Sequence, residues 1–269
     1  PVKFTVAIGN DFMESELDRS KLHNVQLPQI FNKEILLKNG TKSWETAKEK
    51  IVFPKGKTWL DYVRDTRLEI SCGEAPYLVS RYDTTTGEFI KIENRIGILD
   101  RKLRVVNENL DTISDWLKAA ETAFKSTYGF EWQGDSLLLA REALLITFIE
   151  NFTYKFETEP QLDYIQKIAE IISWNIWQMD GLKGVIPNSC KDETIEIPDF
   201  FETRTEIKKC KGCETQNIKS HNGIYCNIMD WDLEKPIKFI SFNFITPNFI
   251  NGSNIYYYFY VFNFNFRSK

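Results

Sequence analysis

The chain has 269 residues, with 34 Lys and Arg against 38 Asp and Glu, and a formal net charge of −4. Hydrophobic residues make up 42% and charged residues 27%, which excludes wholesale disorder and fits one large domain or one domain with an appendage. A general electrostatic binder of nucleic acid needs a basic surplus that this composition lacks, although a local basic face remains open.

The sequence shows no targeting or membrane segment. No run of about 18 apolar residues predicts a transmembrane helix, and the first ten residues do not read as a signal peptide. The five Cys are an odd number and are unevenly spread. That pattern favours reduced thiols over a disulfide framework, so we expect a cytoplasmic protein without membrane contact.

Composition divides the chain into four zones. Residues 1–50 form a mixed, polar N-terminal extension in which Val2 to Ile8 alternates weakly, like a strand. Residues 51–185 alternate short apolar strands with helical patterns, which predicts an α/β unit with a parallel sheet and flanking helices. Residues 186–236 are loop-rich and Cys-rich, and 237–269 form an aromatic and Asn-rich tail.

Apolar spacing and capping residues predict the elements of the α/β unit. Two short strands are expected, at 67–70 and at 95–100. A helix capped by Asp111 or Thr112 should end before Gly129, and a third strand should end at Gln133. The two helices that follow are expected over 138–152 and from Leu162 to about Met179, with Gly181 past the end of the second and with Trp174 and Trp177 on one core-facing side.

The candidate ligand-binding residues lie at the ends of the predicted strands. Residues 68–78 read Leu-Glu-Ile-Ser-Cys-Gly-Glu-Ala-Pro-Tyr-Leu, and small residues in such a turn let backbone N–H groups approach a ligand closely. Asp100 ends the second strand, where it either accepts both hydroxyls of a ribose or is a solvated loop residue. Asp135 follows the third strand, where it either accepts from an exocyclic amine or caps the next helix.

These segments resemble a known enzyme family. The run at 68–78 is similar to the first motif of the S-adenosylmethionine-dependent DNA methyltransferases that methylate amino groups, usually Leu-(Asp/Glu)-Pro-x-x-Gly-x-Gly-x-(Phe/Leu). Residues 97–100 and 134–135 resemble their second and third motifs. The longer runs 72–83 and 173–181 are similar to a bacterial subgroup of restriction–modification methylases. The resemblance covers residues 51–236.

The resemblance implies a Rossmann-like methyltransferase sheet that binds S-adenosylmethionine, and methylation of adenine N6 in DNA. The target base would be extruded from the duplex into the active site. DNA and a restriction subunit are the implied partners. Six residues would contact the cofactor: around its methionine part Glu69, Cys72, Gly73 and Ala75, at its ribose Asp100, and at its adenine amine Asp135.

The chain also departs from the family pattern. Ala75 replaces the usual second Gly and is followed by Pro76, residues 84–88 insert what looks like a hairpin tip, and Asp100 stands one residue further from Gly97 than usual. The family's catalytic Asn/Asp-Pro-Pro-Tyr/Phe motif should follow the third motif, yet the chain contains no Pro-Pro. We therefore expect a truncated N-terminal portion of such an enzyme, without catalytic residues and inactive alone.

The Cys-rich zone suggests a metal site. Cys210 and Cys213 form a Cys-x2-Cys knuckle that presents two thiolates to one tetrahedral ion, with a Gly that lets the turn close. Cys226 would supply the third ligand, and Cys190 or His221 the fourth. This favours a structural zinc ion, with unlinked thiols as the alternative. The competing function is a non-enzymatic zinc-containing module that contacts a nucleic acid or a partner subunit through neighbouring lysines.

The tail at 237–269 contains twelve aromatic residues. Such a segment is prone to β-structure and to aggregation. Two interpretations stay open, namely a reading-frame accident that makes the tail non-native and a hydrophobic edge packed on the domain.

Overall fold

The computed structural model describes residues 51–53, 55–83, 86–198 and 203–241. It also describes two short strands, β1 (Ala7–Ile8) and β2 (Ser15–Glu16), which pair antiparallel. The strand expected over Val2 to Ile8 therefore lies outside the described residues apart from β1. The tail lies outside them beyond residue 241.

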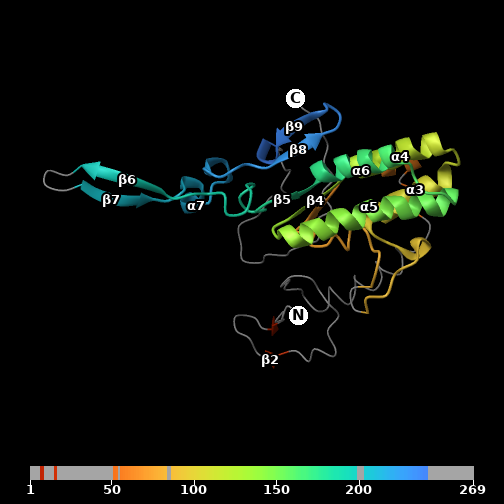
Figure 1. Cartoon of the computed structure of the whole chain (residues 1–269), viewed down its shortest axis with the longest axis horizontal. Helices are drawn as coiled ribbons and strands as arrows, with labels where there is room; N and C mark the ends of the chain where they lie inside the picture. Colours follow the sequence, from red (N-terminus) through yellow and green to blue (C-terminus); the bar gives the residue numbers. More distant parts are fainter. Residues whose placement is uncertain are drawn as a thin grey trace.

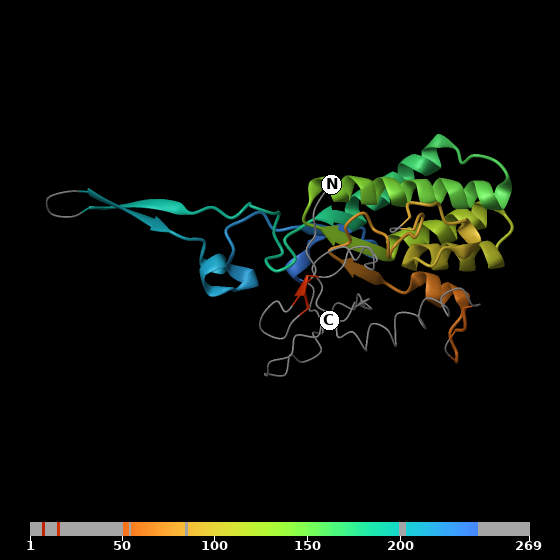
Figure 2. The same ribbon diagram turned by 90° about the horizontal axis from the view of Figure 1, so that it is seen from below.

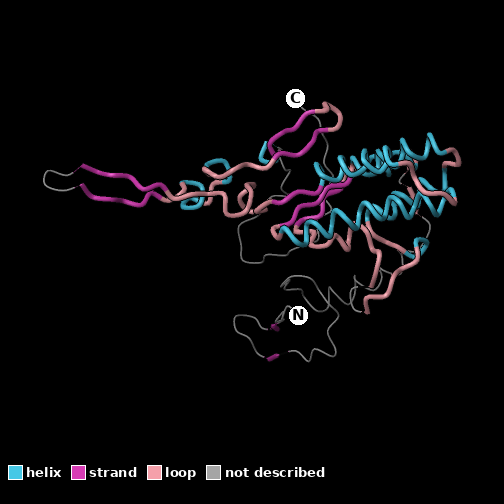
Figure 3. Tube along the Cα trace, in the orientation of Figure 1, coloured by secondary structure: helices cyan, strands magenta, loops and turns pink. Residues whose placement is uncertain are grey.

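A three-stranded parallel sheet forms the centre of the fold (Figure 3). Its strands are β3 (Arg67–Ile70), β4 (Thr127–Glu131) and β5 (Ile176–Gln178), in the order β3-β4-β5. Every residue of the central strand β4 is buried. The expected mixed α/β class with a parallel sheet is confirmed.

Helices cover one face of this sheet (Figure 1). Their apolar stripes enclose a core that includes Ile176 of β5, in which the indole of Trp116 lies edge-on against Phe152 and Phe156. The helices are α2 (Trp59–Arg64), α3 (Ile98–Asn109), α4 (Ile113–Lys125), α5 (Gly134–Phe156) and α6 (Leu162–Asn175).

The opposite face of the sheet has its own core. Successive residues of a strand point to opposite faces, so Leu68, Tyr128 and Trp177 face away from the helices. They pack with residues of an antiparallel hairpin formed by β8 (Asn227–Asp230) and β9 (Lys235–Lys238), and with the short helix η4 (Phe239–Ser241). The sheet is thus a middle layer between helices and a hairpin.

Several predicted elements are confirmed. β3 occupies 67–70 as expected, and Thr112 rather than Asp111 caps α4 by accepting from the Asp115 backbone N–H. α5 covers the predicted long helix and extends it at both ends. The hairpin tip at 84–88 is supported by an antiparallel bridge between Tyr82 and Phe89, although residues 84 and 85 lie outside the described part.

The strand predicted at 95–100 is wrong. A short 3-10 helix, η2 (Ile92–Asn94), precedes this stretch, and Ile98 already begins α3. Short apolar runs such as this one fit either a strand or a helix. The helix prevails because Leu99, Leu103 and Val106 bury one face and because the Asp100 carboxylate accepts from the Gly97 backbone N–H at the N-terminus.

One helix end and the place of one glycine are also corrected. The second helix ends at Asn175 rather than near Met179, because Ile176 and Trp177 bury opposite sides of strand β5. Trp177 is a core residue as expected, but it does not share a helix face with the half-buried Trp174. α4 ends at Lys125, before Gly129 as expected, but Gly129 is not the residue directly past the helix end: it lies within β4, where a Cβ would stand 3.3 Å from the Cys72 side chain.

The zone at 186–236 contains more regular structure than the expected loops. β6 (Glu193–Pro198) and β7 (Thr203–Lys208) form an antiparallel hairpin that projects from the body in both views (Figures 1 and 2). After it come the short helices α7 (Lys211–Thr215) and η3 (Ile218–Ser220). None of the helices within the described residues combines the length and apolar character needed to cross a bilayer.

Candidate functional site

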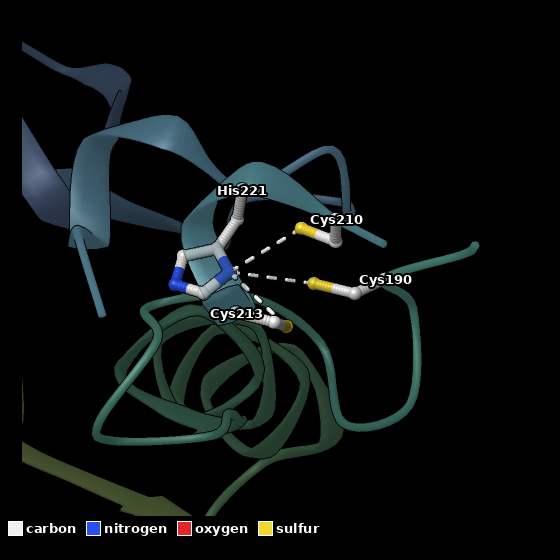
Figure 4. A group of neighbouring side chains, drawn as sticks. All are labelled: Cys190, Cys210, Cys213 and His221. Atoms are coloured by element: carbon white, nitrogen blue, oxygen red, sulfur yellow. Dashed lines mark hydrogen bonds between the residues drawn. The ribbon is translucent and has the colours of Figure 1, made fainter. Parts of the chain in front are cut away.

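Four side chains converge at the base of the β6–β7 hairpin (Figure 4). They are Cys190, Cys210, Cys213 and His221, and their ligand atoms all lie within 4.8 Å of one another. His221 Nδ1 faces the three sulfur atoms, at 3.6 Å from Cys190, 3.7 Å from Cys210 and 3.6 Å from Cys213. A tetrahedral ion with Zn–S near 2.3 Å and Zn–N near 2.0–2.1 Å would separate sulfur from nitrogen by about 3.6 Å. The cluster therefore has the dimensions of a metal site.

Two glycines permit this convergence. A Cβ on Gly212 would lie 2.5 Å from the His221 backbone N and 2.6 Å from its ring. A Cβ on Gly223 would lie 3.0 Å from both the backbone N and the Sγ of Cys190. Either side chain would force the ligand-bearing segments apart, so the Gly in the knuckle is required by close packing against His221 as well as by the turn.

The polar surroundings of Cys210 favour a thiolate. Burial raises the pKa of this thiol, but hydrogen bonds from the Asn222 and Cys213 backbone and from His221 outweigh burial and lower the pKa to about 6. The Asn222 N–H donates to Cys210 Sγ at 3.3 Å. Burial and the two neighbouring thiols raise the pKa of Cys190 to about 11. A divalent cation would therefore bind one ready thiolate and displace protons from the others.

The observed ligand set differs from the predicted one at Cys226. Cys190 and His221, which the sequence offered as alternatives, both belong to the cluster, whereas Cys226 does not. The Cys226 thiol donates to the Gln178 carbonyl at 3.3 Å and is buried in the core beside the β8–β9 hairpin. Its backbone N–H donates to the Gly184 carbonyl, and this bond helps to hold Cys226 beside the sheet.

A second candidate site lies at the carboxyl ends of β3 and β4. After β3 the chain bends through three left-handed residues, with φ of 55° at Ser71, 55° at Gly73 and 62° at Ala75. The Gly73 N–H donates to Glu131 Oε2 at 2.8 Å, and the Gln133 N–H donates to Glu131 Oε1 at 3.1 Å. Glu131, a buried residue at the end of β4, was missed by the sequence reasoning. The available signal was its position in the predicted third strand, two residues before the expected end at Gln133.

Glu69 is the buried acid of this edge. Its side chain is 8% exposed, and Oε2 has no hydrogen-bond partner among the described residues. Burial raises its pKa well above the ordinary value, a backbone hydrogen bond from Leu78 opposes that rise, and the neighbouring Glu131 adds to it. Burial, Glu69 and Glu131 raise the pKa of the Cys72 thiol. Two carboxylates that share one dry edge suit a proton or a positively charged ligand.

Asp100 lies in the first turn of α3 rather than at the end of a strand. Its Oδ2 accepts from the Ser80 backbone N–H at 2.6 Å, from Ser80 Oγ at 3.1 Å and from the Gly97 N–H at 3.2 Å. Its Oδ1 has no partner in the part of the chain that the structure describes. The solvated-loop alternative is wrong because the side chain is 4% exposed. Glu69 and Asp100 thus hold the same stretch, at Leu78 and Ser80.

Asp135 is exposed in the first turn of α5. The N-cap of that helix is Gln133, without a side-chain hydrogen bond, so the alternative interpretation of Asp135 as an N-cap is wrong. Its carboxylate therefore stands near the positive end of the helix dipole and beside the end of β4, where it is accessible to a ligand.

Compared with protein-family models, with curated proteins and with solved structures, the chain matches none. The resemblance to methyltransferases therefore depends on the motifs quoted from the sequence.

Proposed function

We propose that the α/β unit is the S-adenosylmethionine-binding portion of an adenine-N6 DNA methyltransferase from a restriction–modification system, with a Rossmann-like sheet. The observation that carries the proposal is the carboxyl edge of β3 and β4. There, the segment that resembles the first methyltransferase motif runs from the parallel strand β3 into the turn after it, and Glu69 keeps a buried oxygen without a partner among the described residues. Open α/β sheets bind nucleotide ligands at this edge.

The proposed roles follow from the surroundings of each residue. The unpartnered oxygen of Glu69 suits the ammonium group of the methionine part, because charge-assisted hydrogen bonds strengthen in a dry environment. Cys72, Gly73 and Ala75 form the turn that lies against that part of the ligand. S-adenosylmethionine would supply the methyl group, while DNA would supply the acceptor amine.

The two aspartates differ in how they would contact the cofactor. Asp135 is exposed and ready to accept from the adenine amine of the cofactor. Asp100 already accepts from Ser80 and Gly97, so a ribose would use its second oxygen, Oδ1. The chain contains no Asn-Pro-Pro-Tyr run, so we propose cofactor binding without methyl transfer by this chain alone.

Calorimetric titration with S-adenosylmethionine tests this proposal. Glu69→Gln removes the charge but keeps the shape, and a charge-assisted hydrogen bond of about 1.5–3 kcal/mol corresponds to binding weakened about 10- to 100-fold. Glu88→Gln, an exposed acid away from β3, is the control and should bind as the unmodified chain does. Absence of binding at about 1 mM cofactor, or turnover on mixed-sequence DNA, would contradict the proposal.

We also propose that the Cys3His cluster holds one structural zinc ion. Four protein ligands leave no open coordination position, which is the arrangement of structural rather than catalytic zinc. Zinc–thiolate sites need reduced cysteines, so the cytoplasm is the proposed compartment. Metal analysis of protein purified without chelator should find one zinc per chain, and Cys213→Ser should lose it.

The competing function is a zinc-containing module that binds DNA or a restriction subunit without catalysis. The cluster favours this alternative, since exposed lysines at 208, 209 and 211 flank it and are able to contact phosphate. Stoichiometric zinc together with no cofactor binding would select this module over the methyltransferase portion. A gel-shift titration with duplex DNA at increasing salt then tests for phosphate contacts.

A further inference from the structure

The β6–β7 hairpin, here called the arm, has little to hold it except its own base. Six residue pairs join its two strands, from Glu193–Lys208 to Pro198–Thr203. Within the described part of the chain, neither strand makes extensive contact with any other helix or strand. Figures 1 and 2 both show the arm extending away from the sheet and helices. A two-stranded hairpin without a packing partner is only marginally stable in water.

The Cys3His cluster lies where the arm joins the body. Cys190 precedes β6 by three positions, and Cys210 follows β7 by two. Cys213 and His221 come from the segment after the arm. One ion bound by these side chains would therefore tie together both ends of the arm and the chain that follows. Joining the ends of a loop in this way removes conformational freedom from the open state.

The hydrogen bonds that join the two ends of the arm at its base are few, and they are exposed to solvent. The Lys191 N–H donates to Asn222 Oδ1 at 3.2 Å, and Asn222 Nδ2 donates to the Lys191 carbonyl at 2.7 Å. The Cys210 N–H donates to Asp192 Oδ1 at 3.4 Å. Lys191, Asp192 and Asn222 are exposed, so water competes for these bonds and each adds little.

We infer that the zinc ion acts as a clamp, which means that the arm stays an ordered hairpin only while the ion is bound at its base. The arm is a closed hairpin in the zinc-bound protein and opens in the metal-free protein, while the sheet and helices stay folded. The body is insensitive to the metal because neither hydrophobic core contains any of the four ligands. The inference rests on the proposed zinc site and adds a structural consequence to it.

Amide hydrogen exchange on the full chain, under reducing conditions, tests the clamp. The probe is zinc alone, held by a metal buffer at about 100 times its Kd or removed by a chelator. If opening requires release of the ion, zinc slows exchange at 193–196 and 205–208 by about 100-fold. Exchange in α5 should change by less than about twofold, because that helix belongs to the body.

Variants separate the clamp from its alternatives. With zinc present, Cys213→Ser should exchange in the arm like the metal-free chain. Cys226→Ser, a cysteine outside the cluster, should keep the full zinc effect. Asn222→Ala, which removes the hydrogen bonds to Lys191, should also keep most of it at saturating zinc.

Three outcomes would overturn the inference. Equal arm exchange with and without zinc, alongside one bound zinc per chain, would reject the clamp but leave the zinc site standing. Loss of arm protection in Asn222→Ala at full zinc occupancy would assign the clamp to hydrogen bonds instead. Absence of zinc binding would reject the zinc site itself, and the clamp with it.

Discussion

Gly212 illustrates how one residue without a side chain decides whether a cluster can form. The knuckle pattern predicts a Gly for the turn between two cysteines, but the tighter constraint is the backbone of His221, which passes 2.5 Å from the position of a Cβ. A contact between residues nine positions apart in the sequence, 212 and 221, is invisible to a local motif. The motif therefore identified the right residue for an incomplete reason.

Gly212→Ala should weaken zinc binding by about 10- to 100-fold, because the ligand His221 must shift to make room and changes next to metal ligands have effects of this size. Competition with a chromophoric zinc chelator measures the affinity. Gly134→Ala is the matched control, since the nearest atom to its Cβ would be 3.8 Å away and the residue begins α5. Equal zinc affinity for the two variants would refute the steric argument.

At the scale of elements, the sequence predicts secondary structure correctly where a helix buries one face over several turns or a strand buries one face over several residues. α4 and α5 follow their apolar spacing, and β3 follows its short apolar run. The predictions for 95–100 and 176–179 fail because each stretch contains only three apolar side chains, and so short a pattern fits both a helix and a strand. Tertiary contacts decide them: Leu78 backbone carbonyl accepts from Leu99 in the first case, and β4 pairs with β5 in the second.

The candidate sites divide in the same way. The Cys-x2-Cys pair was predictable, since its spacing alone presents two sulfurs to one ion. The choice among Cys190, His221 and Cys226 was not, because it depends on which of them the hairpins carry to the cluster. Glu131 joins the carboxyl edge only through the parallel pairing of β3 with β4.

Asn175 is the last residue of α6 and directly precedes β5. Its Nδ2 donates to the carbonyls of Phe124, Lys125 and Thr127 at 3.0–3.1 Å, and its Oδ1 accepts from the Trp231 indole at 2.8 Å. The side chain is 1% exposed. It thus joins the end of α4, the start of β4 and the β8–β9 hairpin at one buried point.

Asn175→Ala should lower the free energy of unfolding by about 3 kcal/mol, because several buried polar groups lose their partner at once. Urea unfolding followed by circular dichroism measures the change. Asn109→Ala provides the comparison, since its exposed side chain donates to the Val105 carbonyl in its own helix. We expect a loss below about 1 kcal/mol there. Similar losses in the two variants would show that Asn175 has no special role.

At the scale of the whole molecule, buried ionisable groups set how stability depends on pH. Burial raises the pKa of Asp100 to about 6, against an ordinary value of 3.8, and raises that of Glu69 well above 4.5. Burial lowers the pKa of Lys102, whose ammonium donates to the Asp65 and Ser126 carbonyls and to the Ser126 hydroxyl. The acids bind more protons in the folded chain than in the unfolded chain, and Lys102 binds fewer.

The signs of these contributions follow from linkage. A carboxyl whose pKa is raised on folding stabilises the fold fully below its unfolded pKa, and that stabilisation is lost as the pH rises through the folded value. For Asp100 the window runs from about pH 4 to about pH 6. A rise of about two pKa units corresponds to about 3 kcal/mol. Lys102 acts in the opposite sense, toward alkaline pH. A comparison of variants therefore isolates the contribution of Asp100 to stability better than the pH profile of one protein does.

Asp100→Asn keeps an oxygen for Ser80 and Gly97 but does not titrate. Between pH 4 and pH 7, the free energy of unfolding of the unmodified chain should therefore fall relative to that of the variant, by up to about 3 kcal/mol. Urea unfolding of both proteins at each pH measures the difference. Parallel pH profiles for Asp100→Asn and the unmodified chain would contradict a raised pKa of Asp100 in the folded chain.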